Sequence, residues 1–80
     1  MRLPRDVSGQ QLADALSVLG YVVTRQRGDH LRLTTQRDGE HHVSIPLHDP
    51  LRIGTFAGIL SDVAAHFSLS RDVLLQQLNL

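Results

Sequence analysis

The segment from Arg25 to Leu33 constrains the fold most, because it predicts a tight β-hairpin. Gly28 and Asp29 can form a two-residue turn, since glycine at the first turn position suits the twist of paired strands. A turn of this length pairs Arg27 with His30 and Arg25 with Arg32. Side chains alternate across a strand, so four should share one face: Arg25, Arg27, His30 and Arg32. Leu31 and Leu33 should then face the core.

A helix should precede this hairpin. Ser8 and Gln11 have the spacing of a capping box, and Val7 and Leu12 have that of a hydrophobic staple. Apolar residues then recur at helical spacing and predict a buried stripe of Leu12, Ala15, Leu16 and Leu19. Gly20 should end the helix, because glycine readily adopts the left-handed conformation that follows many helices.

Three strands are expected, over residues 21–27, 30–35 and 41–45. Gly39 marks the second turn, and Pro46 should end the third strand because proline cannot continue the hydrogen-bond ladder. Alternation along each strand predicts two sets of side chains. Those expected to face the core are Val22, Val43 and Ile45. Those expected on the arginine side are Tyr21, Val23, His42 and Ser44.

The C-terminal part predicts two more helices. Thr55 or Gly54 should cap the first, whose core stripe is expected to be Phe56, Ile59, Leu60, Val63, Ala64 and Phe67. Ser70 should cap a short final helix with three inward residues, Val73, Leu74 and Leu78. The predicted fold is therefore an α+β two-layer domain: helix, three-stranded antiparallel sheet, helix and short C-terminal helix, with one sheet face open. Eighty residues leave room for a single domain, residues 1–80.

Composition limits the classes of function. Eight basic and eight acidic residues give a formal net charge of zero, whereas nucleic-acid-binding proteins are usually basic. All the basic residues are arginine, however, which is the better bidentate ligand for phosphate. The chain has no cysteine, and its sequence contains neither a membrane-length apolar run nor an apolar N-terminal signal. We expect a soluble cytoplasmic protein without disulfides.

The hairpin face has the residue types that an RNA-cleaving site needs. Histidine titrates near neutral pH, so His30 can accept a proton from a ribose 2′-hydroxyl. Guanidinium groups suit the charged oxygens of the phosphorane that forms. The alternative, from the residues alone, is a solvated sheet face edged with charge.

Two of the other histidines are candidates for the same face. His42 can approach His30 across the strands, and His48 can approach it from the following loop. Asp49 can orient an imidazole or simply begin a turn. His66 lies late in a helix, where positive charge is favourable, and we assign it no function. The histidines lack the spacing of metal ligands, and no thiolate or clearly placed carboxylate joins them, so no metal and no cofactor are expected.

Several short motifs occur in a specific order. They are LGY at residues 19–21, RQRGDHLRL at 25–33, HHVSIPLHDPL at 41–51, and IGT at 53–55 leading into IL at 59–60. In this order and spacing, from about Ser8 to the C-terminus, the chain resembles the HicA-type (YcfA-like) mRNA interferase toxins of prokaryotic toxin–antitoxin systems.

The resemblance implies a compact fold like that of the double-stranded-RNA-binding domain, and metal-independent cleavage of mRNA. It also implies a HicB-type antitoxin as partner, whose partial RNase-H-like domain covers the active face. The family's histidine after a glycine turn corresponds to His30. The family usually has Gly-Ser-His where this chain has Gly28-Asp29-His30, so a carboxylate stands beside the expected phosphate site.

We therefore expect an endoribonuclease toxin with His30 as general base and with His42 or His48 as the candidate acid. Contacts to RNA or phosphate are expected from Arg25, Arg27, Gly28, Arg32, His42 and His48. Two alternatives stay open: a non-catalytic RNA-binding module, and an interaction domain whose open sheet face serves a protein partner or a homodimer.

Overall fold

The protein has the predicted α+β architecture. The computed structural model describes residues 3–80, and its elements follow the expected order. They are helix α1 (Gly9–Leu16), 3-10 helix η1 (Ser17–Leu19), strands β1 (Val22–Arg27), β2 (His30–Thr35) and β3 (His41–Pro46), and helices α2 (Ile53–Phe67) and α3 (Arg71–Leu78). Within the described residues, no helix combines the length and the apolar character needed to cross a lipid bilayer.

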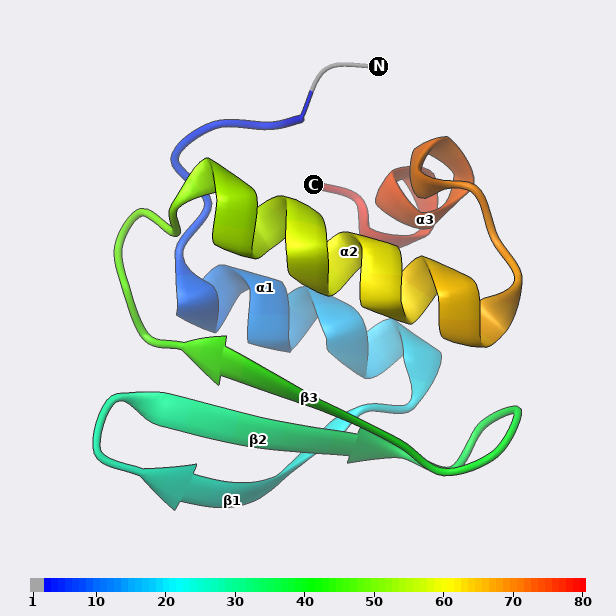
Figure 1. Cartoon of the computed structure of the whole chain (residues 1–80), viewed down its shortest axis with the longest axis horizontal. Helices are drawn as coiled ribbons and strands as arrows, with labels where there is room; N and C mark the ends of the chain where they lie inside the picture. The colour runs from blue at the N-terminus through cyan, green and yellow to red at the C-terminus, as the bar shows by residue number, and fades with distance from the viewer. Residues whose placement is uncertain (1–2) are drawn as a thin grey trace.

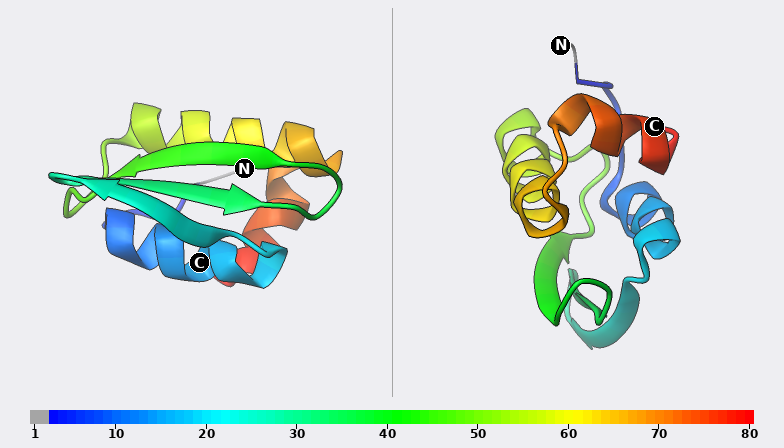
Figure 2. Two further views of the ribbon diagram at one scale, coloured as in Figure 1. Left: turned by 90° about the horizontal axis from the view of Figure 1, so that it is seen from below. Right: turned by 90° about the vertical axis from the view of Figure 1, so that its right-hand side faces the viewer.

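The elements form a sheet layer and a helix layer (Figure 1). The three strands are antiparallel in the order β1-β2-β3. Helices α1 and α2 lie over the same side of the sheet, and α3 lies beyond them, away from the strands (Figure 2). The other side of the sheet carries no helix. This arrangement resembles the double-stranded-RNA-binding domain and leaves one broad sheet face available for function.

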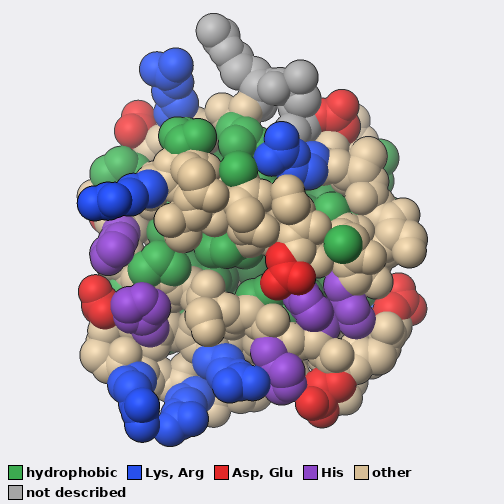
Figure 3. Space-filling model, in the orientation of Figure 1, with side chains coloured by type: hydrophobic (Ala, Val, Ile, Leu, Met, Phe, Trp, Pro, Cys, Tyr) green, Lys and Arg blue, Asp and Glu red, His purple; other side chains and the backbone are tan. Residues whose placement is uncertain are grey.

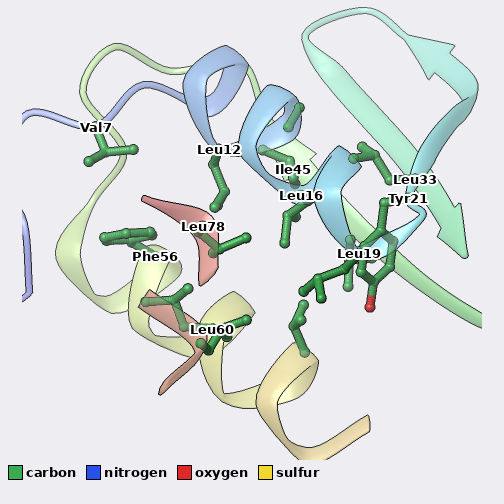
Figure 4. Packing of buried hydrophobic residues seen from close by; sticks show 14 of the residues in the cluster. Val7, Leu12, Leu16, Leu19, Tyr21, Leu33, Ile45, Phe56, Leu60 and Leu78 are labelled. Atoms are coloured by element: carbon green, nitrogen blue, oxygen red, sulfur yellow. The ribbon is translucent and has the colours of Figure 1, made fainter. Parts of the chain in front are cut away.

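The core lies between the helices and the covered face of the sheet (Figure 4). Leu12 and Leu16 of α1 and Leu60 of α2 are completely buried, and they meet Leu33 and Ile45 of the sheet. The stripes predicted on α1 and α2 therefore do form the core, and the predicted inward side chains of β2 and β3 are also correct. Burial of these apolar side chains is the main term that stabilises so small a domain.

Local signals determined where α1 begins and ends. Ser8 Oγ accepts a hydrogen bond from the Gln11 amide at 3.0 Å, and the Gln11 side chain accepts one from the Ser8 amide at 2.8 Å. The predicted capping box is thus present. Gly20 follows the helical segment in the left-handed conformation with φ 85°, as expected.

Two expectations about the later helices were wrong. Helix α2 is capped by neither Thr55 nor Gly54: its first helical hydrogen bond runs from Phe56 N to Arg52 O at 2.9 Å, so the helix begins at Ile53. In α3, Val73 is 40% exposed, and Leu75 is buried in its place beside Leu74 and Leu78. Ser70 does cap α3, with its Oγ accepting from Val73 N.

A β-bulge in β1 reverses the expected facing of the residues at its start. The pairing with β2 shifts between Val23 and Arg25, so Thr24 is an extra residue. One extra residue shifts the two-residue alternation by one position. Tyr21 is therefore buried (1% exposed), although it was expected on the arginine side, and Val22 is 61% exposed, although it was expected in the core. Val23 pairs on the core side but stays half exposed, because β1 is an edge strand.

The buried Tyr21 joins β3 to α2. Its hydroxyl lies 2.7 Å from His41 Nδ1, and His41 Nε2 lies 3.1 Å from Asp62 Oδ1. The His41 ring also stacks on His66, with 4.4 Å between ring centroids. His41 thus points to the helix side of the sheet, and its neighbour His42 points to the arginine side, because side chains alternate along a strand.

Tyr21 should ionise only in strong alkali. Burial, followed by the negative charge of Asp62, raises the pKa of Tyr21 to about 12 from the usual 10.0. Because this pKa is higher than in the unfolded chain, the stability that Tyr21 contributes is complete below pH 10 and is lost as pH rises through about 12. The chain has one tyrosine and no tryptophan, cysteine or lysine. Its tyrosinate absorbance should therefore rise together with the loss of circular dichroism in that window, and a folded protein titrating at pH 10 would contradict the assignment.

Candidate active site

The β1–β2 hairpin brings the predicted basic residues together. Gly28 opens the two-residue turn with φ +58°, and the register pairs Arg27 with His30 and Arg25 with Arg32. Both pairs were predicted from the length of the turn. The bulge lies before Arg25, so it does not disturb the facing of these residues.

The paired residues form a shallow pocket of about 170 Å³ on the open side of the sheet. Its lining residues are Arg25, Arg27, His30, Leu31, Arg32 and Ser44. Figure 3 shows arginine side chains gathered over the end of the sheet near the β1–β2 turn, with histidine side chains beside them. Three guanidiniums and one imidazole thus surround one hollow, an arrangement suited to a phosphate group.

Asp29 lies in the turn and contacts two histidines. Its Oδ1 lies 2.9 Å from His30 Nδ1, and its Oδ2 lies 3.6 Å from His48 Nε2. The hydrogen bond from His30 lowers the pKa of Asp29 from its usual value, so this carboxyl group is ionised near neutral pH. The turn residue Asp29 therefore joins the two histidines nearest to the turn.

The loop after β3 holds His48 beside the turn. Leu47 N donates a 2.6 Å hydrogen bond to Asp29 O, and Gly9 N donates a 2.9 Å hydrogen bond to His48 O. The backbone on each side of the His48 side chain is thus tied to the hairpin and to the start of α1. Asp49 makes no side-chain contact with His48 among the hydrogen bonds and ion pairs of residues 3–80.

His42 shares the open face but stands apart from the pocket. His30 pairs with Pro46, and His42 pairs with Thr34, so the two histidines are separated by four positions along the strands, roughly 13 Å. Both ring nitrogens of His42 have partners: Thr34 Oγ1 at 2.7 Å and Glu40 Oε2 at 2.9 Å. Hydrogen bonds from His42 and then Gln36 lower the pKa of Glu40.

Sequence reasoning missed two features of this site. Ser44 lines the pocket. Its predicted position on the arginine side of the sheet could have identified it as a site residue, but it was not included among them. The bridge from Asp29 to His48 joins residues nineteen positions apart, and only the tertiary fold brings them together. Arg37 lies outside the pocket lining and donates to Val18 O at 2.9 Å.

No metal centre is formed by the described part of the chain. Within residues 3–80, no group of three or more His, Cys, Asp or Glu side chains is placed to hold a metal ion. The residues that line the pocket offer proton transfer by imidazole and charge stabilisation by guanidinium.

A family comparison places this site in context. Residues 9–64 match the family model described as the HicA toxin of bacterial toxin–antitoxin systems. The chain belongs to the HicA toxin family. The matched range includes α1, the whole sheet and most of α2, and so contains every pocket residue. No curated protein and no solved structure matches the chain.

Membership in the HicA family identifies the general role of the chain. It is a toxin of the toxin–antitoxin type, from a family that is generally RNase-like, and the family implies an antitoxin partner.

Proposed function

We propose that this HicA-family toxin is an mRNA interferase, an endoribonuclease that cleaves RNA without a metal ion. The observation that supports this most directly is the pocket in which His30 lies among Arg25, Arg27 and Arg32. Phosphodiester cleavage in RNA needs a base for the 2′-hydroxyl and cations for the phosphorane. The pocket supplies one imidazole and three guanidiniums for those two tasks.

In this proposal His30 acts as general base. Its Nδ1 faces Asp29, so Nε2 is the nitrogen that meets the 2′-hydroxyl. The three arginines bind the scissile phosphate and offset the charge that develops on it. Gly28 contributes by its positive φ and by the open space around it, since a Cβ there would meet nothing within 4 Å. An RNA backbone can therefore pass close to the turn.

In this proposal the toxin works in the cytoplasm, and its protein partner is a HicB-type antitoxin that covers the open face of the sheet. Exposed Val22 on that face supports protein contact, since it is 61% exposed in the row of the sheet that it shares with Thr34 and His42. A homodimer through the same face is the alternative occupant, and a size measurement with and without antitoxin separates the two.

A cleavage assay tests the proposed activity. The purified chain should degrade single-stranded RNA in the presence of EDTA and should leave DNA of the same sequence intact, because DNA lacks the attacking 2′-hydroxyl. Binding without cleavage would instead support the non-catalytic RNA-binding module. Absence of both would contradict the proposal.

Arg32 should make a salt-dependent contribution to RNA binding. It lies on the central strand between Arg25 and Ser44, where its side chain can reach a phosphate in the pocket. Arg32→Gln should weaken binding and reduce the slope of log affinity against log salt by about one. Arg71→Gln, at the start of α3, is the matched control and should leave the slope unchanged. Equal slopes for wild type and Arg32→Gln would exclude this contact.

A further inference from the structure

Asp29 contacts the two histidines nearest to the turn, and this gives the site a second proton-transfer group. We propose that Asp29 is a carboxylate bridge that positions His30 and His48 as an acid–base pair, with His30 as the base and His48 as the acid. This inference rests on the proposed function and extends it, because it identifies which residue protonates the leaving group.

Each imidazole directs one ring nitrogen toward the Asp29 carboxylate. His30 presents Nδ1 to Asp29 Oδ1 at 2.9 Å, and His48 presents Nε2 to Asp29 Oδ2 at 3.6 Å. No hydrogen bond within residues 3–80 occupies the opposite nitrogen of either ring, so His30 Nε2 and His48 Nδ1 are available to a substrate. Both side chains are well exposed, at 59% and 51%. His30 lines the pocket, and His48 lies across Asp29 from it, so in this proposal an RNA chain bound in the pocket extends over Asp29 to His48.

The bridge is held by backbone contacts rather than by side chains alone. Asp29 O accepts from Leu47 N at 2.6 Å, and His48 O accepts from Gly9 N at 2.9 Å. The turn, the loop after β3 and the start of α1 are thus joined at one point. This matters because acid–base catalysis requires both groups to be placed before the substrate binds.

His42, the other candidate acid, is in a different environment. Both its nitrogens have partners, Thr34 and Glu40, and it lies four positions along the strands from His30. Protonating a leaving oxygen from His42 would require one of these contacts to break and the ring to move along the sheet. The geometry therefore favours His48.

The reaction balances with these two residues. His30 Nε2 takes the proton of the 2′-hydroxyl as the 2′-oxygen forms a bond to phosphorus. The bond from phosphorus to the 5′-oxygen breaks, and that oxygen takes the proton carried by His48. The products are a 2′,3′-cyclic phosphate and a free 5′-hydroxyl, with His30 protonated and His48 neutral. An ionised Asp29 stabilises the positive charge on each imidazole in turn, which offsets its repulsion of the phosphate.

A substrate with a better leaving group separates the acid from the base. In RNA with sulfur in place of the bridging 5′-oxygen, the thiolate leaves without needing a proton. His48→Ala should cut ordinary RNA about 10²–10⁴-fold more slowly than wild type, but should cut the sulfur-bridged RNA within about threefold of the wild-type rate. His30→Ala should be slow on both substrates. Circular dichroism and thermal melting confirm that each variant is folded.

The outcomes are distinct. In two cases wild type cleaves RNA but the acid assignment is wrong, while the proposed nuclease survives. In the first, His48→Ala is equally slow on ordinary and sulfur-bridged RNA. In the second, His48→Ala cuts ordinary RNA as fast as wild type does. If sulfur rescues His30→Ala instead, the two roles are reversed. If wild type cleaves neither substrate, the proposed function itself fails.

Asp29→Asn tests the bridge. Asparagine keeps the shape of the side chain but can donate to His30 and hold the wrong tautomer, so kcat on ordinary RNA should fall by about 10²-fold. KM should not rise, because the substitution removes a negative charge near the phosphate. A variant with unchanged kcat would show that Asp29 is only a turn residue, and would overturn its positioning role.

Discussion

Replacing His30 with alanine should lower the rate of RNA cleavage by about 10²–10⁴-fold. His30 is the imidazole that lines the arginine pocket, and its side chain is 59% exposed. Its removal therefore takes away a proton acceptor without disturbing the core. The rate is measured on single-stranded RNA in EDTA, and folding is checked by thermal melting.

Two controls make the His30 result specific. His66→Ala removes a histidine from the helix side, where Nε2 contacts Arg37 O at 2.9 Å, and should cleave RNA at the wild-type rate. His30→Ala should still bind RNA, because the three arginines of the pocket remain. Equal cleavage by wild type and His30→Ala would remove the general base from the proposal.

Gly9→Ala should destabilise the protein by about 2 kcal/mol, equivalent to a fall in melting temperature of about 10 °C for a domain of this size. A Cβ on Gly9 would overlap the carbonyl oxygen of Pro46 and lie 3.1 Å from Leu47 Cα. These are backbone atoms, so no side-chain rotation relieves the clash. Alanine favours a helix over glycine by roughly 1 kcal/mol, but this gain is smaller than the expected cost of overpacking.

The matched control for Gly9 is Gly58→Ala in the exposed part of α2. A Cβ on Gly58 meets nothing within 4 Å, so helix propensity alone acts and the melting temperature should rise. Gly9→Ala should also slow RNA cleavage, because Gly9 N holds His48 O. A melting temperature equal to or above that of wild type would contradict the close packing of α1 against the loop.

Much of the fold follows from local pattern. The capping box at Ser8, the left-handed Gly20 and the apolar stripe of α2 each depend on residues close in sequence, and each was predicted correctly. The facing of Tyr21 was not, because a single extra residue in β1 reverses the alternation. Sequence alone contains no signal that distinguishes a regular strand from one with a bulge at Thr24.

The candidate site was only partly accessible to sequence reasoning. The hairpin residues His30 and Arg32 share a face because turn length determines their register. The position of His48 depends on where a long loop returns, which hydrogen bonds from Gly9 and Leu47 determine. No local rule relates those residues, so the proposal of His48 rather than His42 as the acid required the tertiary structure.

Analysis of the cleavage products tests the central claim most directly. A defined single-stranded RNA is incubated with the protein in EDTA, and the fragment masses are measured beside those from an RNA with a 2′-deoxy nucleotide at the cleaved position. The proposal predicts a 2′,3′-cyclic phosphate and a 5′-hydroxyl, with no cleavage at the deoxy position. Fragments that end in 3′-hydroxyl and 5′-phosphate, or cleavage that persists at the deoxy position, would contradict catalysis by the 2′-hydroxyl and His30.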